Sequence, residues 1–326
     1  MNPGTREIKL RSSKIIPVIF LVCFTCTSHS IKKSGFETSA PPNPVKGFKL
    51  VGIMGEGKLG SAYLRLPTGI AIDFQGNVFI TDTGNDRVVK CDDKGRFLTE
   101  IGGFGRGAGE FNRPTYLATD NGLNIYVMDS QNKRIQRLDA NLNFVSVIEI
   151  KETGDSPGFG LPDGIAITSS GEIVVSDAED DRLIKLNSYF EYDRSIGSFE
   201  NMEAGLRDPL GVVVSRNGDF YVADSRNHRV AVFDAFGNFL RSFGEGILKN
   251  PNGVTVDEDN LIYVANTGEN SLVVFDPKGD VLLEYESLGL GITNLSGPTD
   301  LKFGKDGRLI VVDSKNNRFL AFEILR

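Results

Sequence analysis

Charged side chains recur in this sequence at fixed distances behind six prolines. Asp or Asn stands 15 residues after each of these prolines, and Arg stands 20 residues after five of them. The residues at the first position are Asp82, Asp129, Asp177, Asp224, Asn266 and Asp313. Repeated carboxylates could bind a ligand, but a carboxylate in a turn also caps backbone N–H groups and pairs with Arg. Because a function rarely needs the same group in every repeat, the regular spacing favours turn architecture.

The candidate site residues are instead those that depart from the repeat. Gly stands two residues after the proline in four units, whereas Tyr116 and Asp300 take this position in the second and sixth units. Lys302 replaces a small residue, and Asp163 and Asn252 directly follow repeat prolines. A functional residue is expected where one repeat departs from the consensus, although neutral sequence drift in a tolerant scaffold produces the same departures. We expect a small polar ligand or ion to contact these five residues, and Asp300 to pair with Lys302 on one strand face.

Histidine and cysteine are scarce, which limits the possible chemistry. The sequence has two histidines, and only His228 lies outside the N-terminal segment. This excludes a zinc site of several histidines and leaves a catalytic triad or lyase base short of residues. Cys91 takes a position that Leu or Phe holds in the other units, so we expect a core residue rather than a nucleophile. No cofactor is predicted.

Each repeat is long enough to form one small sheet that positions these residues. The fourth unit, residues 209–243, has four short runs of β-branched and aromatic residues, separated by turn sequences such as Asn217-Gly218. Short runs separated by turn sequences in this way predict antiparallel strands joined by hairpins, with almost no helix. One such sheet cannot bury both of its faces alone, whereas six sheets around an axis bury each one between two neighbours.

The two ends of the repeat region complement each other. The last unit supplies one strand after Arg318 and then lacks the fourth strand of its sheet. Residues 47–55 precede the first unit and match the fourth-strand pattern of residues 237–244. We therefore predict that the N-terminal strand completes the last sheet and closes the ring, which removes an exposed edge.

The repeat resembles a known family. Its consensus, Pro-x-Gly-Val-Ala-x-Asp, Tyr-Val-x-Asp-x-x-Asn-x-Arg-Val and Phe-Asp-x-x-Gly, is similar to the NHL repeat over about residues 47–326. The resemblance implies an all-β fold, a six-bladed β-propeller of four-stranded antiparallel blades. It leaves function open, because the family includes lyases, sensor domains, scaffolds and RNA binders. The histidine zinc site of its amidating lyases has no counterpart here, whereas a lactonase-like hydrolase or lyase with a divalent ion at the channel mouth stays an alternative.

The N-terminal segment predicts export. Basic residues precede an apolar run from Ile15 to Phe24, which is too short to span a bilayer and fits a secretory signal over residues 1–26. Cys26 is a candidate lipidation site, because residues 27–46 are rich in Ser, Thr and Pro and resemble a flexible tether. Plain cleavage near Ser28 or Ser30 is the alternative, since no Leu stands three residues before Cys26.

The net charge and the predicted export together favour a binding role. Residues 1–26 hold four basic residues and one acidic residue, and their removal leaves 32 basic and 42 acidic residues, a net charge of −10. Such an acidic exported protein is a poor candidate for binding nucleic acid. We expect a monomeric, non-catalytic module, attached to the membrane only through a lipid anchor, which binds a protein, peptide or glycan on its loop face. This face carries the loops between repeats, residues 56–66, 103–113, 151–161, 198–208, 244–250 and 289–297.

Overall fold

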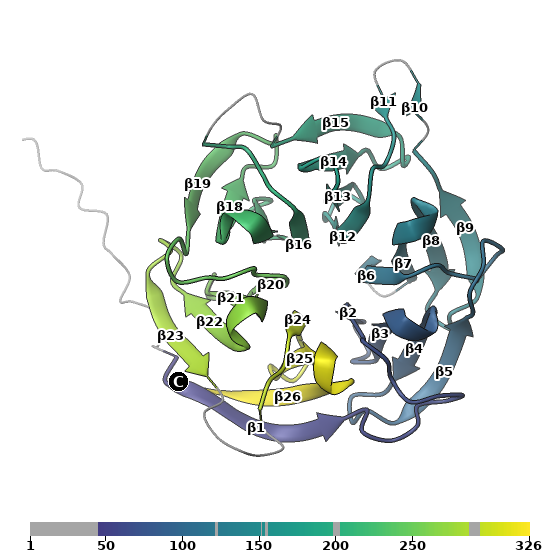
Figure 1. Ribbon diagram of the computed structural model, residues 1–326, viewed down its shortest axis with the longest axis horizontal. Helices are drawn as coiled ribbons and strands as arrows, with labels where there is room; N and C mark the ends of the chain where they lie inside the picture. The colour runs from purple at the N-terminus through teal and green to yellow at the C-terminus, as the bar shows by residue number, and fades with distance from the viewer. Residues whose placement is uncertain (1–44, 121–122, 151, 154–155, 198–202, 287–293) are drawn as a thin grey trace, which may run out of the picture. The chain divides into compact units, whose positions relative to one another are not determined.

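The protein forms a ring of six four-stranded antiparallel sheets around a central axis (Figure 1). The computed structural model describes residues 45–120, 123–150, 152–153, 156–197, 203–286 and 294–326. Within these residues the helical elements are short 3-10 turns. None of the described residues forms a helix with the length and apolar character needed to cross a membrane. The predicted all-β, six-bladed β-propeller is therefore confirmed.

In each blade the first strand lies next to the central axis, and the following strands lie progressively farther out. Blade 1 comprises β2 (Ile70–Ile72), β3 (Val78–Asp82), β4 (Arg87–Cys91) and β5 (Phe97–Gly102). Blade 2 comprises β6 (Pro114–Asp120), β7 (Asn124–Asp129), β8 (Arg134–Asp139) and β9 (Phe144–Ile148). Blade 3 comprises β12 (Pro162–Ile167), β13 (Ile173–Asp177), β14 (Arg182–Leu186) and β15 (Tyr192–Ile196). Blade 4 comprises β16 (Pro209–Val214), β17 (Phe220–Asp224), β18 (Arg229–Phe233) and β19 (Phe239–Phe243). Blade 5 comprises β20 (Val254–Val256), β21 (Ile262–Asn266), β22 (Ser271–Phe275) and β23 (Val281–Glu286). Blade 6 comprises β24 (Pro298–Phe303), β25 (Leu309–Asp313), β26 (Arg318–Leu325) and β1 (Gly47–Met54).

Smaller elements decorate the connections between strands. Strands β10 (Glu152–Thr153) and β11 (Ser156–Pro157) form a separate hairpin before blade 3. Five blades have a 3-10 turn between their second and third strands: η1 (Thr83–Asn85), η2 (Ser130–Asn132), η3 (Ser225–Asn227), η4 (Thr267–Glu269) and η5 (Ser314–Asn316). The inter-blade loops lie at the same end of the strands as these turns. The hairpins between first and second strands lie at the opposite end, which we call the hairpin face.

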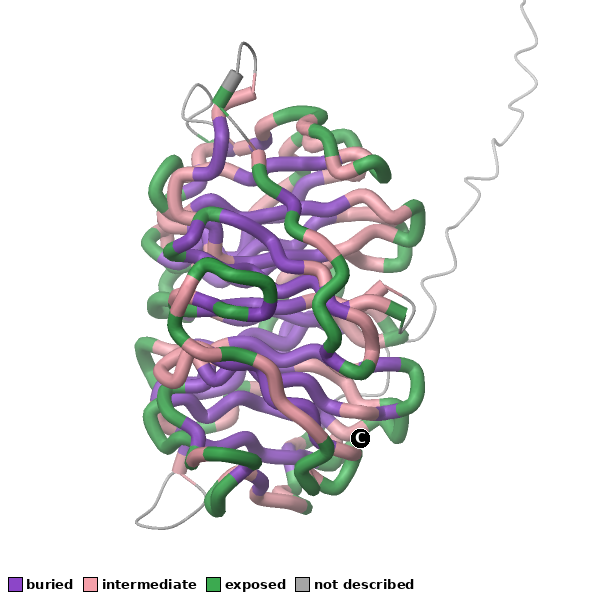
Figure 2. The backbone as a smooth tube through the Cα atoms, turned by 90° about the vertical axis from the view of Figure 1, so that its right-hand side faces the viewer, coloured by how far each residue is buried: buried purple, intermediate pink, exposed green. Residues whose placement is uncertain are grey.

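The core lies between blades rather than within any one of them. Second strands such as β3 are buried along their whole length, because both faces of the sheet meet a neighbouring blade. The outer strand β5 has only exposed and partly buried residues, and buried segments fill the interior of the ring in Figure 2. The buried apolar residues form six clusters, one for each pair of adjacent blades. Cys91 is fully buried in one of them, and burial raises the pKa of its thiol to about 12, which fits the predicted core role.

Strand β1 closes the ring, as the sequence predicts. It pairs antiparallel with β26 and becomes the outermost strand of blade 6. Phe48 is buried, and its ring lies 5.3 Å from the ring of Tyr285 in blade 5 and 6.0 Å from that of Phe322. Leu50 and Ile53 are only partly buried at the edge of the same cluster. The first and last parts of the repeat region therefore depend on each other for burial.

The N-terminal predictions fall almost wholly outside the described residues. The expected signal, Cys26 and residues 27–44 of the expected tether lie there. Val45 is buried in the cluster between blades 5 and 6, and the N–H of Lys46 donates to the carbonyl of Leu325 at 2.7 Å. Parts of the loops 151–161, 198–208 and 289–297 also lie outside the described residues.

Candidate functional site

The repeated Asp–Arg motif builds the turns of the scaffold. In blade 1, Asp82 accepts hydrogen bonds from the N–H of Arg65, the amide of Asn85 and Nε of Arg87, each at 2.7 Å. Asp82 is fully buried, and so are its equivalents in the other blades. The carboxylate therefore joins an inter-blade loop, a turn and a third strand, which confirms the predicted architectural role.

Blade 5 replaces this ion pair with a neutral pair. Asn266 accepts from the N–H of Lys249 at 2.7 Å and donates to the hydroxyl of Ser271 at 3.1 Å. In the other blades the Arg also donates to carbonyls of its inter-blade loop, as Arg229 does to Gly205 at 2.9 Å. The loop before blade 5, residues 244–250, is the shortest of the six inter-blade loops. The short Asn266–Ser271 pair fits this blade, because a longer Arg side chain would have fewer loop carbonyls to which it could donate.

A second set of hydrogen bonds connects five of the six blades to the next blade, and the sequence pattern did not reveal it. The side chain 19 residues after a repeat proline accepts from the backbone N–H just before the next proline. We call each such pair a latch. The latches are Asp86–Arg113 at 2.7 Å, Asp181–Asp208 at 2.7 Å, His228–Asn250 at 3.1 Å, Asn270–Gly297 at 2.7 Å and Asn317–Leu66 at 2.8 Å. Both members of every latch have left-handed φ angles between 45° and 58°. Lys133 occupies the same position in blade 2, but its ammonium cannot accept a hydrogen bond.

The residues that follow the repeat prolines meet at one end of the channel. They are Thr68, Thr115, Asp163, Leu210, Asn252 and Thr299, and all six line one cavity of about 640 Å³. We call this cavity the mouth. It opens on the loop face, and its size is that of an ordinary small-ligand site.

Charges of both signs surround the mouth. Burial raises the pKa of Asp163 from 3.8 to about 6, although Thr115 and the Arg113 guanidinium both favour its charged form. The Asp208 carboxylate raises this pKa further. Arg113 and Lys315 line the same cavity and are exposed to solvent. The mouth can therefore meet a polar ligand with hydroxyl, amide, cationic and anionic groups.

Tyr116 lines the mouth and reaches across the inner strands. Its side chain is only 4% exposed, and its hydroxyl donates to the carbonyl of Thr299 at 2.9 Å. Because Tyr116 belongs to blade 2 and Thr299 to blade 6, the ring reaches past blade 1 inside the channel. Burial raises the pKa of Tyr116 well above its usual value, and the Asp300 and Asp163 carboxylates add to this shift. The phenol therefore stays protonated and acts as a donor.

Asp300 and Lys302 lie deeper and do not line the mouth. Asp300 is 1% exposed, and its carboxylate accepts from the N–H of Ile70 at 3.0 Å and the N–H of Leu301 at 2.9 Å. The expected pairing exists, because Nζ of Lys302 lies 3.3 Å from Oδ1 of Asp300. Burial raises the pKa of Asp300, and Lys302 opposes the shift. The structure thus brings Tyr116, Asp163 and Asn252 together and leaves Asp300 to cap the inner edge of blade 1.

The donors present do not fit a divalent ion. Such ions prefer six or more oxygen ligands, of which several are carboxylates. Within the described ranges, no group of three or more His, Cys, Asp and Glu is arranged to hold a metal.

Comparisons with known proteins agree with this fold. Residues 206–233 and 248–275 match the family described as NHL repeat, and residues 71–152 match the family described as 6-bladed beta-propeller. No curated protein matches the sequence. The chain is similar to a streptogramin B lyase structure at 15% identity and a TM-score of 0.61, over 87% of this chain and 100% of that one. A structural genomics protein of unknown function from Bacteroides thetaiotaomicron is 16% identical with a TM-score of 0.62, over 85% of this chain and 76% of that one.

A third similar structure is the nidogen/laminin complex, at 18% identity and a TM-score of 0.55, over 68% of this chain and 80% of that one. At such identities these neighbours show the fold alone. Repeat spacing, blade geometry and family matches therefore lead to one conclusion: the chain is a six-bladed β-propeller that carries NHL repeats.

Proposed function

We propose that this protein is an exported, non-catalytic binding module whose mouth holds a segment of a protein, a peptide or a glycan. The observation that supports the proposal most is the convergence of six inner strands on one cavity of about 640 Å³. Preformed concave sites with a few convergent polar groups are the usual setting for ligand binding. The proposal includes no nucleic-acid partner and no bound cofactor.

The charge arrangement supports a polar ligand over an apolar one. Asp163 faces the cavity from blade 3, Arg113 approaches it from the loop before blade 2, and Asn252 presents an amide from blade 5. A peptide or glycan offers donors and acceptors at several points, so that side chains from different blades can engage it at once. Truncation of any one group would then weaken binding without abolishing it.

Export and anchoring are part of the same proposal. The N-terminal segment would direct the chain out of the cytoplasm, and acylation of Cys26 would hold the propeller at the membrane through residues 27–46. The acidic net charge fits a soluble domain outside the cell.

Screening the purified protein against peptide and glycan arrays tests the binding role. The proposal predicts saturable binding that EDTA leaves unchanged and no turnover of the bound compound. Hydrolysis or elimination of ester or lactone substrates that depends on added Ca²⁺ or Mg²⁺ would instead support the lactonase-like alternative. Such turnover, without array binding, would refute the non-catalytic role.

A further inference from the structure

A second cavity lies on the hairpin face, at the other end of the inner strands from the mouth. Its volume is about 650 Å³, and it is lined by residues 214–216, 256–259 and 303–308 of blades 4, 5 and 6, and by residues 323, 324 and 326. Strand β16 connects the two sites, because Leu210 lines the mouth and Val214 lines this cavity. We call it the hairpin cavity. It is as large as the mouth and is built from other residues.

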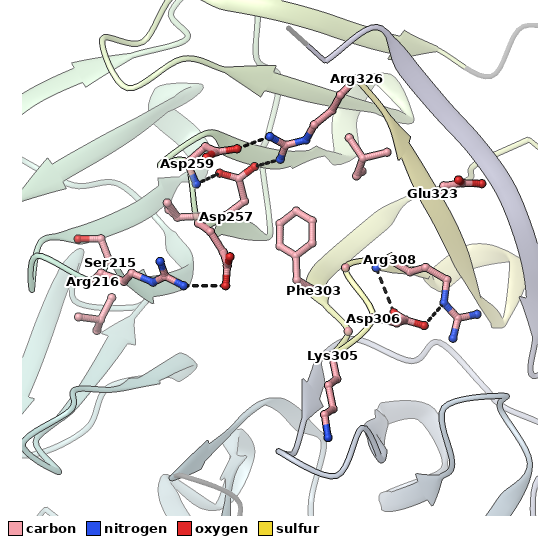
Figure 3. Close-up of a pocket in the computed structure, with 16 residues that line it drawn as sticks. Ser215, Arg216, Asp257, Asp259, Phe303, Lys305, Asp306, Arg308, Glu323 and Arg326 are labelled. Carbon is pink, nitrogen blue, oxygen red and sulfur yellow. Dashed lines mark hydrogen bonds and ion pairs between the residues drawn. The ribbon is translucent and has the colours of Figure 1, made fainter. Parts of the chain in front are cut away.

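The floor of the hairpin cavity is apolar. Val214, Val256, Phe303 and Ile324 line it, and each is only partly buried. The Phe303 ring stands edge-on to Tyr263, with ring centroids 5.0 Å apart and an interplanar angle of 82°. Figure 3 shows the Phe303 ring in the middle of the lining residues, between Arg216 and the Asp306–Arg308 pair. The cavity thus offers a fixed aromatic surface inside a polar rim.

One side of the rim is an ion-pair cluster around Arg326. Its guanidinium lies 2.7 Å from Oδ2 of Asp257 and also pairs with Asp259. The side chain of Asp257 is only 5% exposed, and its Oδ2 accepts from the hydroxyl of Tyr263 at 3.0 Å as well. This carboxylate is therefore fixed in place from two directions.

Two other rim arginines are also paired, whereas Lys305 has no ion-pair partner among the described residues and Glu323 pairs at 3.0 Å with Lys49, which lies outside the cavity lining. Arg216 pairs with Glu258 at 2.8 Å, and Arg308 pairs with Asp306 (Figure 3). A charged ligand that bound these arginines or carboxylates would have to compete with their internal pairs. A neutral ligand would not, because exposed groups such as Arg216 and Glu258 keep further donor and acceptor positions.

Apolar lining residues that include an aromatic ring, beside carboxylate and guanidinium groups that can exchange hydrogen bonds with hydroxyls, match the chemistry of a sugar. One face of a pyranose ring carries C–H groups, and its edge carries hydroxyls. We propose that the hairpin cavity binds a neutral carbohydrate of one or two sugar units, stacked on Phe303 with its hydroxyls at the rim. The volume lies within the range of small-molecule sites, roughly 300–1,000 Å³. This site is separate from the mouth and does not rest on the function proposed there.

Calorimetric titration and saturation-transfer NMR with defined sugars test the proposal. The panel contains glucose, galactose, mannose, N-acetylglucosamine, maltose and cellobiose, with glucuronate as a charged comparator. At least one neutral sugar should bind with a Kd on the order of 1 mM. Glucuronate should bind at least about tenfold more weakly than the best neutral sugar, because the three rim arginines are already paired and the lining has five acidic residues against four basic ones.

Two variants locate the site. Phe303→Leu keeps an apolar side chain but removes the ring, and should weaken binding by at least about tenfold. The double variant Arg216→Gln, Glu258→Gln changes an exposed part of the rim without touching the core, and should weaken binding by about three- to tenfold. Leu240→Ala, an exposed position on β19, is the control and should keep the wild-type Kd.

The proposal fails if no neutral sugar binds up to about 20 mM, a concentration well above the expected Kd. It also fails if glucuronate binds as tightly as the neutral sugars, or if the rim variant and Phe303→Leu both keep wild-type affinity. Loss of sugar binding in Asp163→Asn, with Phe303→Leu unaffected, would place the sugar in the mouth and overturn the hairpin cavity as its site.

Discussion

Oδ1 of Asn317 in the last blade accepts a hydrogen bond from the backbone N–H of Leu66, just before the first blade, at 2.8 Å. This latch closes the ring on the loop face, while the pairing of β1 with β26 closes it at the outer edge. The propeller therefore has two closures that involve different parts of the chain. Each can be removed separately.

The Asn317 latch contributes to stability through its hydrogen bond, and Asn tolerates the left-handed backbone at this position. We expect Asn317→Ala to lower the free energy of unfolding by about 1–2 kcal/mol, since Ala loses the acceptor and tolerates a left-handed φ less well. Asn317→Asp keeps the acceptor and should stay near wild type. Lys133→Ala is the matched control, because Lys133 has the same backbone conformation, φ 54°, and no latch. Denaturant unfolding checks this, and equal midpoints for Asn317→Ala and wild type would contradict it.

The outer closure depends on burial of Phe48. We expect Phe48→Ala to cost about 3–5 kcal/mol, as for other large side chains removed from a core. Val51→Ala lies on the same strand, but Val51 is 42% exposed, so this control should cost less than about 1 kcal/mol. Deletion of residues 47–56 should lower the melting temperature further, because it leaves the edge of β26 unpaired. An unchanged melting temperature for the deletion would refute the role of β1.

Stability should depend on the protonation of Asp163. Its folded pKa of about 6 lies above the ordinary value of 3.8, so the folded state binds more protons than the unfolded state between these values. Stability attributable to Asp163 is therefore present below about pH 4 and is lost as pH rises through about 6, by on the order of 1–3 kcal/mol. Asp163→Asn should remove this loss and be more stable than wild type at pH 7. Parallel pH profiles of the two proteins would contradict the assignment.

Many features of the fold follow from the sequence, because they repeat at fixed spacing. The Asp82–Arg87 pair spans a single turn, so its role is visible from residues 82–87 of the sequence alone. The closing strand is visible because residues 47–55 and the incomplete last unit need each other. The first relationship is local and recurs in five of the repeats. The second is visible because the repeat pattern shows which strand the last unit lacks.

The parts that the sequence did not reveal depend on contacts between blades. Latch acceptors are Asp, His or Asn, so no single residue type marks the position. Asp300 departs from the repeat in the way a ligand-binding residue would, but its carboxylate caps the N–H of Ile70, 230 positions away along the chain. The hairpin cavity is assembled from three separate hairpins, each of which has an ordinary turn sequence.

Anchoring can be tested without the structure. If Cys26 is acylated, Cys26→Ser should move the protein from the membrane fraction to the soluble fraction of the envelope. Fractionation followed by mass spectrometry of the N-terminus measures this directly. An unmodified N-terminus at Ser30 or Ile31 would instead support plain secretion.

The most direct test of the proposed function is the affinity of mouth variants for the strongest array ligand. Asp163→Asn, Asn252→Ala and Arg113→Ala change three sides of the mouth, while Leu98→Ala changes an exposed position on the outer strand β5. We predict that at least two of the three mouth variants bind about tenfold or more weakly, with Leu98→Ala unchanged. Wild-type affinity in all three mouth variants would show that the ligand binds elsewhere on the propeller.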